Sequence, residues 1–337
     1  MMVRKKARAK MKRASELVFV ADIGGTTTRF GIAELKRNEA PGLLLVEEIP
    51  TSHIKDVSRT CWEFLGRAKQ RIGRRPKRGC IAAAGPCADG VVRITNARLV
   101  ADERQLAKKL KIKIAVINDF EALAYAIPTL GGHDTVALRK GKGGGPVALV
   151  GPGTGLGKAL ILRDGTETMV LPSEGGHAEL PFQENQQPLR DFLMKELSTA
   201  AITYEDVLSG RGLERLYLYL RRTAFRDEAL PARLSATEVS ATRRENRCSE
   251  AALELFVRLL ARCCRNFVLE TGAFGGLWVA GGIAARNSDA FGEQFLRELA
   301  NHPERQYRAL LERVPVTLVT RLDAGLLGAA LRAEGKG

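Results

Sequence analysis

The sequence lacks the features that mark several common classes of protein. Its six cysteines form no CxxC pair and have no histidine at the spacing of a zinc site, which indicates reduced thiols. No apolar run reaches the roughly eighteen residues that a membrane span needs. The opening segment also lacks the apolar stretch of a signal peptide. We therefore expect a cytoplasmic protein with no membrane partner.

Two common nucleotide-binding signatures are also missing. The Walker A pattern GxxxxGK[ST] fails because Pro152 takes the place of its first glycine and Ala159 that of its hydroxyl residue. The glycines at positions 151, 153, 155 and 157 do not give the GxGxxG pattern of dinucleotide-binding folds either. The chain is therefore predicted to be neither a P-loop enzyme nor a Rossmann dehydrogenase.

Positive charge is plentiful but unevenly placed. Lysine and arginine exceed the acidic residues by 15, and part of this excess opens the chain. A second basic cluster lies between Arg67 and Arg78. We interpret both as solvated surface, with polyanion binding as the alternative, and expect no nucleic-acid partner. Residues 1–15 are predicted to form a basic disordered arm that carries Arg4, Lys5, Lys6, Arg8, Lys10, Lys12 and Arg13.

The stretch LVFVADIGGTTTRFGIAEL predicts a hairpin with a glycine-rich turn. Leu17 to Ala21 form an apolar run typical of a buried strand, and the β-branched and apolar pattern after the glycines suits a second strand. Paired glycines let backbone N–H groups approach a phosphate, while a carboxylate at the turn suits hydrated Mg²⁺. The alternative is a tight hairpin whose aspartate caps its own turn. The candidate phosphate-binding residues are Asp22, Gly24, Gly25, Thr26 and Thr27.

The same arrangement recurs in the second half of the chain. Pro146 to Lys158 combines a buried strand with a turn that holds Gly153 and Thr154, and Ala159 to Leu162 continue as an apolar strand. A further double glycine, Gly281-Gly282, ends the predicted strand 276–283. Two facing hairpins of this kind could hold a polyphosphate between two lobes.

Strands and helices alternate between these hairpins, as is typical of an α/β protein. The chain of 337 residues is long enough for two lobes. We predict a small α/β domain over residues 16–129, completed by a C-terminal helix at 324–337, and a large α/β domain over 130–323. The predicted strands are 79–84, 91–95, 112–117 and 314–319, and the predicted helices are 56–70, 101–110, 120–126, 249–270 and 326–333.

Polar residues suited to a hydroxyl-rich substrate occur at three places. Asn118-Asp119 follow a buried strand, where open α/β sheets bind ligands, although an aspartate there can simply cap a helix. The turn PSEGGHAE, at 172–179, gathers Glu174 and His177 around two glycines. Glu205 is a weaker candidate, because the segment Thr203 to Asp206 also fits a helix capping box.

Seven segments in this order resemble the bacterial-type glucokinases, which belong to the actin and hexokinase fold superfamily. The resemblance spans Leu17 to Gly328 and implies a two-lobed α/β fold, actin/hexokinase-like (ribonuclease H-like), in which each lobe is a mixed sheet with flanking helices. The segments are DIGGTTTRFGI, AAAGPCADGVVRITN, INDFEALAYAIP, GPGTGLG, PSEGGHAEL, YEDVLSGRGL and VAGGIAAR.

The resemblance also implies a function, ATP-dependent phosphorylation of glucose to glucose 6-phosphate, by a homodimer. It makes Asp119 the catalytic base and places Mg²⁺ near Asp22, held through water. The residues implied to contact glucose are Asn118, Gly155, Glu174, His177 and Glu205, and those implied to bind ATP are Asp22, Gly24, Gly25, Thr26, Thr27, Gly153, Thr154, Gly281 and Gly282.

The chain departs from the family pattern at one place and has two competing interpretations. Thr95 to Val100, TNARLV, lacks the aromatic residue that this family often carries after its Thr-Asn. The cysteine-rich zinc motif of the related repressor-kinase group is absent, which disfavours that group. The alternatives are a kinase of the same fold for mannose, fructose or an N-acetylated hexosamine, and a sugar-sensing regulator.

Overall fold

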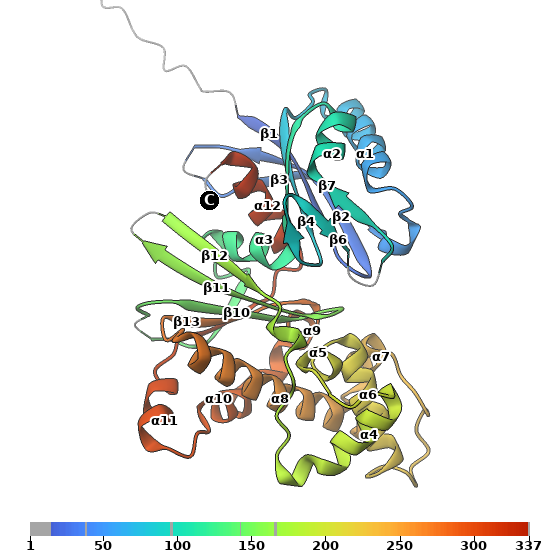
Figure 1. Cartoon of the computed structure of the whole chain (residues 1–337), viewed down its shortest axis with the longest axis vertical. Coiled ribbons are helices and arrows are strands. Elements are labelled where there is room, and N and C mark those ends of the chain that lie inside the picture. The colour runs from blue at the N-terminus through green and yellow to red at the C-terminus, as the bar shows by residue number, and fades with distance from the viewer. Residues whose placement is uncertain (1–14, 38, 95–96, 142, 165–166, 336–337) are drawn as a thin grey trace, which may run out of the picture.

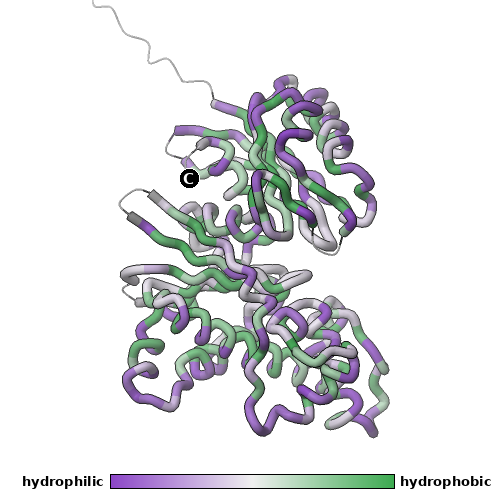
Figure 2. Tube along the Cα trace, in the orientation of Figure 1, coloured by the Kyte–Doolittle hydropathy of each residue, from purple (hydrophilic) through white to green (hydrophobic). Residues whose placement is uncertain are grey.

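The computed structural model describes residues 15–335 except 38, 95–96, 142 and 165–166. The predicted arm before Ser15 and the Thr-Asn pair of TNARLV therefore lie outside the described residues. The chain folds into two lobes, each built on its own sheet (Figure 1). None of the described helices is both long and apolar enough to cross a membrane. Hydrophobic segments run along the strands of both sheets (Figure 2).

The small lobe contains a mixed five-stranded sheet whose first two strands form the predicted hairpin. These two strands are antiparallel, with Asp22 opposite Arg29. β1, β4 and β8 are parallel, so Ile23, Ala83 and Asn118 end at the same edge of the sheet. This is the edge where parallel strands present ligand-binding loops. The order across the sheet is β3 (Gly42–Pro50), β2 (Thr27–Leu35), β1 (Glu16–Ile23), β4 (Arg78–Ala83) and β8 (Lys113–Asn118).

Two helices cover one face of this sheet and bury the larger of its two apolar clusters. α1 begins after Asp56, which accepts a hydrogen bond from the Arg59 N–H, and ends at Gly73 in the left-handed conformation. α2 is capped by Asp102 and so begins two residues later than predicted. The bounds are α1 (Val57–Ile72) and α2 (Glu103–Leu110), with the short strands β5 (Cys87–Ala88), β6 (Val91–Arg93) and β7 (Val100–Asp102) nearby.

The C-terminal helix α12 (Ala324–Glu334) packs on the opposite face of the small-lobe sheet, beside β1 (Figure 1). It also lies against α3 (Asp119–Ala126), the helix that follows β8. Gly328 sits at this crossing, where a Cβ atom would overlap the backbone carbonyl of Ala122. The close helix contact therefore fixes α3, and the residue at its start, against the small lobe.

The large lobe contains a mixed six-stranded sheet. The antiparallel pair β10 and β11 forms the second predicted hairpin, with Gly151 opposite Gly157. β10, β13 and β14 are parallel neighbours, and β9 pairs with β14 in the antiparallel direction. The order across the sheet is β12 (Glu167–Ser173), β11 (Leu156–Asp164), β10 (Val147–Pro152), β13 (Gly276–Val279), β14 (Val316–Val319) and β9 (Thr135–Arg139).

The long helix α8 is the main helix of the large lobe and closely matches its predicted bounds. Its buried side chains join those of the surrounding helices in the largest apolar cluster of the described chain. One predicted element is wrong at its end: the strand at 276–283 stops at Val279, and Ile283 is helical. The helices are α4 (Gln187–Leu197), α5 (Tyr204–Val207), α6 (Gly210–Arg222), α7 (Ala236–Thr242), α8 (Arg247–Thr271), α9 (Gly282–Arg286), α10 (Glu293–Ala300) and α11 (Arg305–Leu311).

Candidate active site

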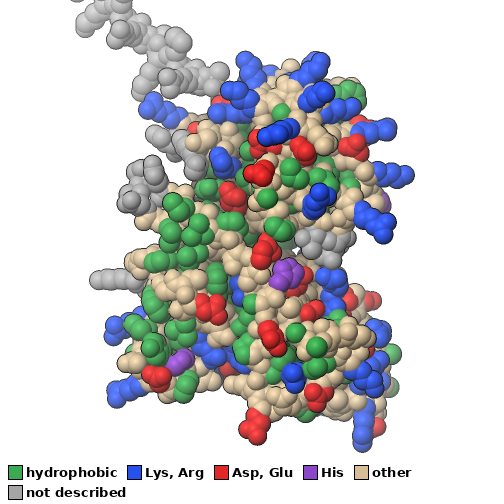
Figure 3. Space-filling view, viewed as in Figure 1, with side chains coloured by type: hydrophobic (Ala, Val, Ile, Leu, Met, Phe, Trp, Pro, Cys, Tyr) green, Lys and Arg blue, Asp and Glu red, His purple; other side chains and the backbone are tan. Residues whose placement is uncertain are grey.

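All of the predicted site residues line one cavity between the two lobes, with a volume of about 600 Å³. Acidic and histidine side chains are visible at this junction of the lobes (Figure 3). The cavity is bounded by loops that follow the strands of both sheets. The predicted residues that it brings together are Asp22, Gly24, Gly25, Thr26, Thr27, Asn118, Asp119, Gly153, Thr154, Gly155, Glu174, His177, Glu205, Gly281 and Gly282.

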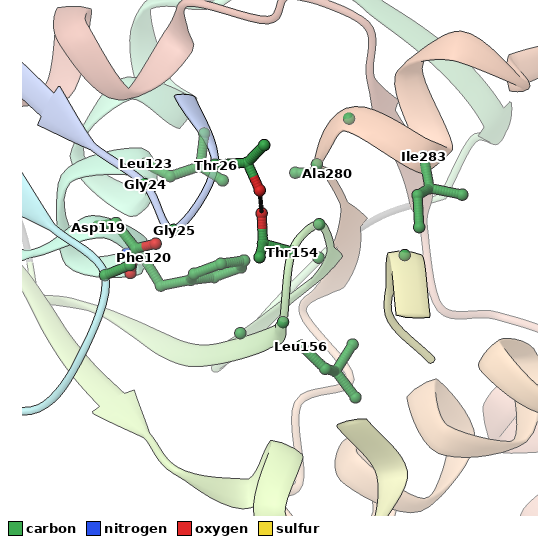
Figure 4. A pocket seen from close by; sticks show the side chains of 18 of the residues that line it. Gly24, Gly25, Thr26, Asp119, Phe120, Leu123, Thr154, Leu156, Ala280 and Ile283 are labelled. Carbon is green, nitrogen blue, oxygen red and sulfur yellow. Dashed lines mark hydrogen bonds between the residues drawn. The ribbon is translucent and has the colours of Figure 1, made fainter. Parts of the chain in front are cut away.

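The two glycine-rich turns face each other across this cavity. The hydroxyl oxygens of Thr26 and Thr154, one from each lobe, lie 2.9 Å apart in a hydrogen bond (Figure 4). Each turn is closed by its own backbone bond, from the Gly24 N–H to Thr27 and from the Gly153 N–H to Gly155. The structure therefore brings the paired hairpins of the sequence into direct contact.

The third double glycine packs against the second hairpin. Gly281 has a φ of 94°, a conformation that residues with a Cβ rarely adopt. A Cβ at this position would also overlap the backbone carbonyl of Pro152. Both requirements explain why glycine stands here and why the strand pairing stops at Val279.

Asn118, and not Asp119, is the residue that caps α3. Its side-chain oxygen accepts hydrogen bonds from the N–H groups of Phe120 and Glu121, at 2.9 and 3.2 Å. Its amide nitrogen donates to the carbonyl oxygen of Gly85 at 2.9 Å. The alternative in which the aspartate serves as the cap is therefore wrong, since Asp119 is the first helical residue and lies beside Gly25 (Figure 4).

Two neighbouring carboxylates give this part of the cavity its electrostatic character. Burial, followed by the charge of Asp22 and then that of Glu174, raises the pKa of Asp119 to about 7. Burial likewise raises the pKa of Asp22 to about 6, against the opposing effect of Arg29. The Arg29 guanidinium lies 3.9 Å from the Asp22 carboxylate. An acid that titrates near neutral pH is suited to accept a proton during a reaction.

Glu205 reaches the second hairpin from α5. Its carboxylate accepts a hydrogen bond from the Leu156 N–H at 3.0 Å, and a Cβ at Gly155 would overlap it. The predicted capping box also exists, but it is made by Thr203 and Asp206. The capping box is therefore present, and it leaves the Glu205 side chain free to line the cavity.

Glu174 and His177 lie at the more open side of the cavity. Their side chains are each more than half exposed, and the imidazole Nε2 is 3.9 Å from the carboxylate. Glu174 directly precedes the short 3₁₀ turn Gly175–His177, which presents both side chains. The hydroxyl of Ser173 accepts a hydrogen bond from the Gly175 N–H at 3.1 Å and closes the start of this turn.

Three of the cavity residues that were not predicted from the sequence make notable contacts. The ring of Phe120 extends from α3 toward Thr154 (Figure 4) and fills the space left by the paired glycines 151 and 157 of the second hairpin. Lys158 lines the cavity from β11 although the residue is almost completely buried. Arg29 pairs with Asp22 as well as with Glu48. The glycine at 157 was the one available signal, since it marks a close approach by another group.

Several known proteins are similar to this chain over almost its whole length. A family model described as Glucokinase matches residues 19–336. A glucokinase of Pseudomonas aeruginosa is 33% identical over 338 residues, which cover 96% of this chain and 98% of the relative. The crystal structure of a glucokinase from an Antarctic psychrotroph has a TM-score of 0.77 and 29% identity, covering 95% of this chain and 99% of its own.

A more distant structural neighbour shows the same architecture. The glucokinase of Balamuthia mandrillaris, solved in complex with glucose, has a TM-score of 0.79 at 23% identity and covers 97% of this chain and 96% of its own. The predicted actin/hexokinase-like fold is therefore confirmed. The chain belongs to the glucokinase family, whose enzymes phosphorylate glucose with ATP.

Proposed function

We propose that Asp119 is the general base for glucose phosphorylation in this chain. The observation that carries the proposal is its place in the cavity, beside the turn of the first hairpin and with a pKa raised to about 7. Asp119 removes the proton of the 6-hydroxyl as that oxygen attacks the γ-phosphorus of ATP. The bond from the γ-phosphorus to the bridging oxygen breaks, and ADP leaves.

The sugar is held by groups that accept and donate hydrogen bonds around Asp119. The carboxylates of Glu174 and Glu205 accept from sugar hydroxyls, and the His177 imidazole can do either. Asn118 has one amide hydrogen left after its bond to Gly85, and that hydrogen is available to the sugar. Gly155 leaves room for the Glu205 carboxylate, which a Cβ at this position would overlap.

The phosphates of ATP lie between the two glycine-rich turns. Gly25 and Thr27 on one side and Thr154 on the other line the cavity, and their backbone N–H groups would bind the phosphates. The contact between Thr26 and Thr154 brings these turns close enough to bind one polyphosphate from both lobes. Gly281-Gly282 extend the binding surface from the phosphates toward the nucleoside.

The residues present fit a hydrated magnesium ion near Asp22. No group of three or more His, Cys, Asp or Glu in the described residues could form a complete metal site. Mg²⁺ bound with nucleotides keeps several waters and uses one or two carboxylates together with phosphate oxygens. The partly buried carboxylate of Asp22, which lines the cavity beside the glycine-rich turn, meets that requirement. A magnesium ion bound there would neutralise part of the negative charge of the phosphates.

A reducing compartment such as the cytoplasm is also proposed. All six cysteines are free thiols, and five of them are buried. Buried thiols of raised pKa, such as those of Cys61 and Cys80, are inert and persist most readily where disulfides do not form.

Glu174→Ala should raise the glucose KM by roughly ten- to fiftyfold, since one charged acceptor of a sugar hydroxyl is lost. The ATP KM and kcat should change less than threefold. Steady-state kinetics with each substrate varied in turn measure this. Glu179→Ala is the matched control, because Glu179 is exposed on the same segment outside the cavity. A rise in the ATP KM alone would show that this turn binds the nucleotide and not the sugar.

The choice of sugar is tested by following ADP release with a panel of hexoses. Glucose, mannose, fructose and an N-acetylated hexosamine are compared at equal concentration, with and without added Mg²⁺. We expect glucose to give the highest kcat/KM and chelation to abolish turnover. A higher kcat/KM with another hexose would show that the chain is a kinase of the same fold for that sugar.

A further inference from the structure

Lys158 is a charged residue in an interior position. It lies on β11, opposite Ser173 of β12, and the residue is only 3% exposed. An ammonium group is rarely buried to this extent without a partner of opposite charge. In the described part of the chain, however, no ion pair joins Lys158 to a carboxylate. Its partners are of other kinds.

Two aromatic rings and a thiol surround the ammonium. The Lys158 nitrogen lies 4.3 Å from the centre of the Tyr204 ring and 5.3 Å from that of Phe267. These distances are within the range of cation–π attraction, which is stronger where water is excluded. The Cys263 thiol is also close: burial raises its pKa to about 11, and the positive charge of Lys158 opposes that rise.

The same side chain lies directly beneath the turn that presents Glu174 and His177. A Cβ atom at Gly175 would stand 3.2 Å from the Lys158 Cδ and 3.5 Å from its nitrogen. The Lys158 side chain therefore packs against the turn at Gly175. Its aromatic partner Tyr204 is the residue before Glu205 in α5. The Lys158 side chain thus contacts both segments that carry the proposed sugar-binding side chains. The Lys158 backbone belongs to the hairpin that carries Gly155.

We propose that Lys158 is a positioning residue that fixes the sugar-binding turn relative to Glu205 and the second hairpin. The inference rests on the proposed function of Glu174, His177 and Glu205. The ammonium acts through Tyr204 and the Gly175 backbone, and its charge is opposite to those of the two carboxylates at this end of the cavity. Without the charge, the turn and α5 lose their common contact and the hydroxyl acceptors are less well aligned.

The substitution Lys158→Met tests this role, because methionine keeps most of the unbranched stem and removes the charge. We expect the glucose KM to rise at least tenfold, with kcat and the ATP KM within threefold of the parent. The melting temperature should stay the same or rise, since an apolar side chain suits the buried site better than an ion. Arg163→Met, an exposed position on the same strand, is the control and should change none of these quantities.

Several results would overturn the proposal. A lowered melting temperature with an unchanged glucose KM would make Lys158 a structural residue only. A fall in kcat at constant KM would also contradict it. If Lys158→Met does not fold, Tyr204→Leu removes the nearer of the two cation–π partners and must also raise the glucose KM. An unchanged glucose KM in that variant would reject the role.

A parallel measurement separates this inference from the proposed function. If Glu174→Ala raises the glucose KM and Lys158→Met does not, only the role of Lys158 fails. If Glu174→Ala leaves the glucose KM unchanged, the sugar assignment fails and the inference fails with it. If both single variants raise it, the double variant should show less than the product of the two effects, because both act on the same turn.

Discussion

Replacing Asp119 with asparagine should lower kcat by roughly 10²- to 10⁴-fold while the glucose Kd stays within about threefold. Asparagine keeps the shape of the side chain and loses the ability to take the sugar proton. Asn118 still caps α3 in this variant, so the helix start should be preserved. Turnover is followed by ADP release, and glucose binding by calorimetry or quenching of intrinsic fluorescence. Turnover within threefold of the parent would exclude Asp119 as the base.

The same variant has a second readout, in stability. The pKa of Asp119 is about 7 in the folded chain, above its ordinary value of 3.8, so the folded state favours the protonated acid. That contribution to stability is fully present below pH ~4 and is lost as the pH rises to about 7. Asp119→Asn avoids the loss. Its free energy of unfolding relative to the parent should therefore increase between pH 5 and pH 8. The increase is at most about 3 kcal/mol, and it is smaller because the side chain keeps some contact with water.

Chemical denaturation of the ligand-free proteins at the two pH values measures this difference. Asp134→Asn serves as the control, since Asp134 is a partly buried carboxylate that is paired with Arg321. A difference between parent and Asp119→Asn that does not grow with pH would mean that the folded pKa of Asp119 is not raised.

Gly157→Ala should lower kcat/KM for glucose by roughly 100-fold without touching any proposed ligand contact. The new Cβ would overlap the ring of Phe120, which rests against the hairpin. The ring must then move, and because Phe120 follows Asp119 in the first turn of α3, Asp119 moves with it. A displacement of about 1 Å in a reacting group is enough for an effect of this size. Steady-state kinetics at saturating ATP measure it.

A control and a double variant separate this effect from general damage to the hairpin. Gly144→Ala adds the same methyl group in the loop before β10, where nothing lies within 4 Å of it. It should leave kcat/KM for glucose unchanged. In a Phe120→Ala background the Gly157→Ala substitution should have little further effect, because the overlapping ring is gone. If the effects of the two substitutions on kcat/KM instead multiply, Gly157→Ala acts on catalysis without the Phe120 ring.

The two hairpins were predictable because their signals are local. Each consists of an apolar run, a glycine-rich turn and a second β-forming run, and these features depend on neighbours along the chain. The helix α8 was predicted for the same reason, from one apolar face between Ser249 and Glu270. What the sequence could not show is that Thr26 and Thr154 meet, since 128 positions separate them.

Other outcomes depended on contacts between distant segments. Asn118 and Asp119 both follow a buried strand, and the preference for asparagine as the cap emerges only with the bond to Gly85. The strand that begins at Gly276 loses its pairing with β10 and β14 after Val279, where Gly281 packs against Pro152 of a distant segment. Lys158 stands between apolar residues in the sequence, and its aromatic partners come from α5 and α8.

The most direct test of Asp119 as a base is the pH dependence of the reaction rate, with both substrates far below their KM values so that the rate reports the free enzyme. A base with a pKa of about 7 predicts a plateau above pH 8 and a rate at pH 5 that is roughly 100-fold lower. Asp119→Asn is measured in parallel and should lack the part of this dependence that comes from Asp119. Any pH dependence left in the variant reports the titration of ATP. A parent rate at pH 5 within threefold of the plateau would contradict the assignment.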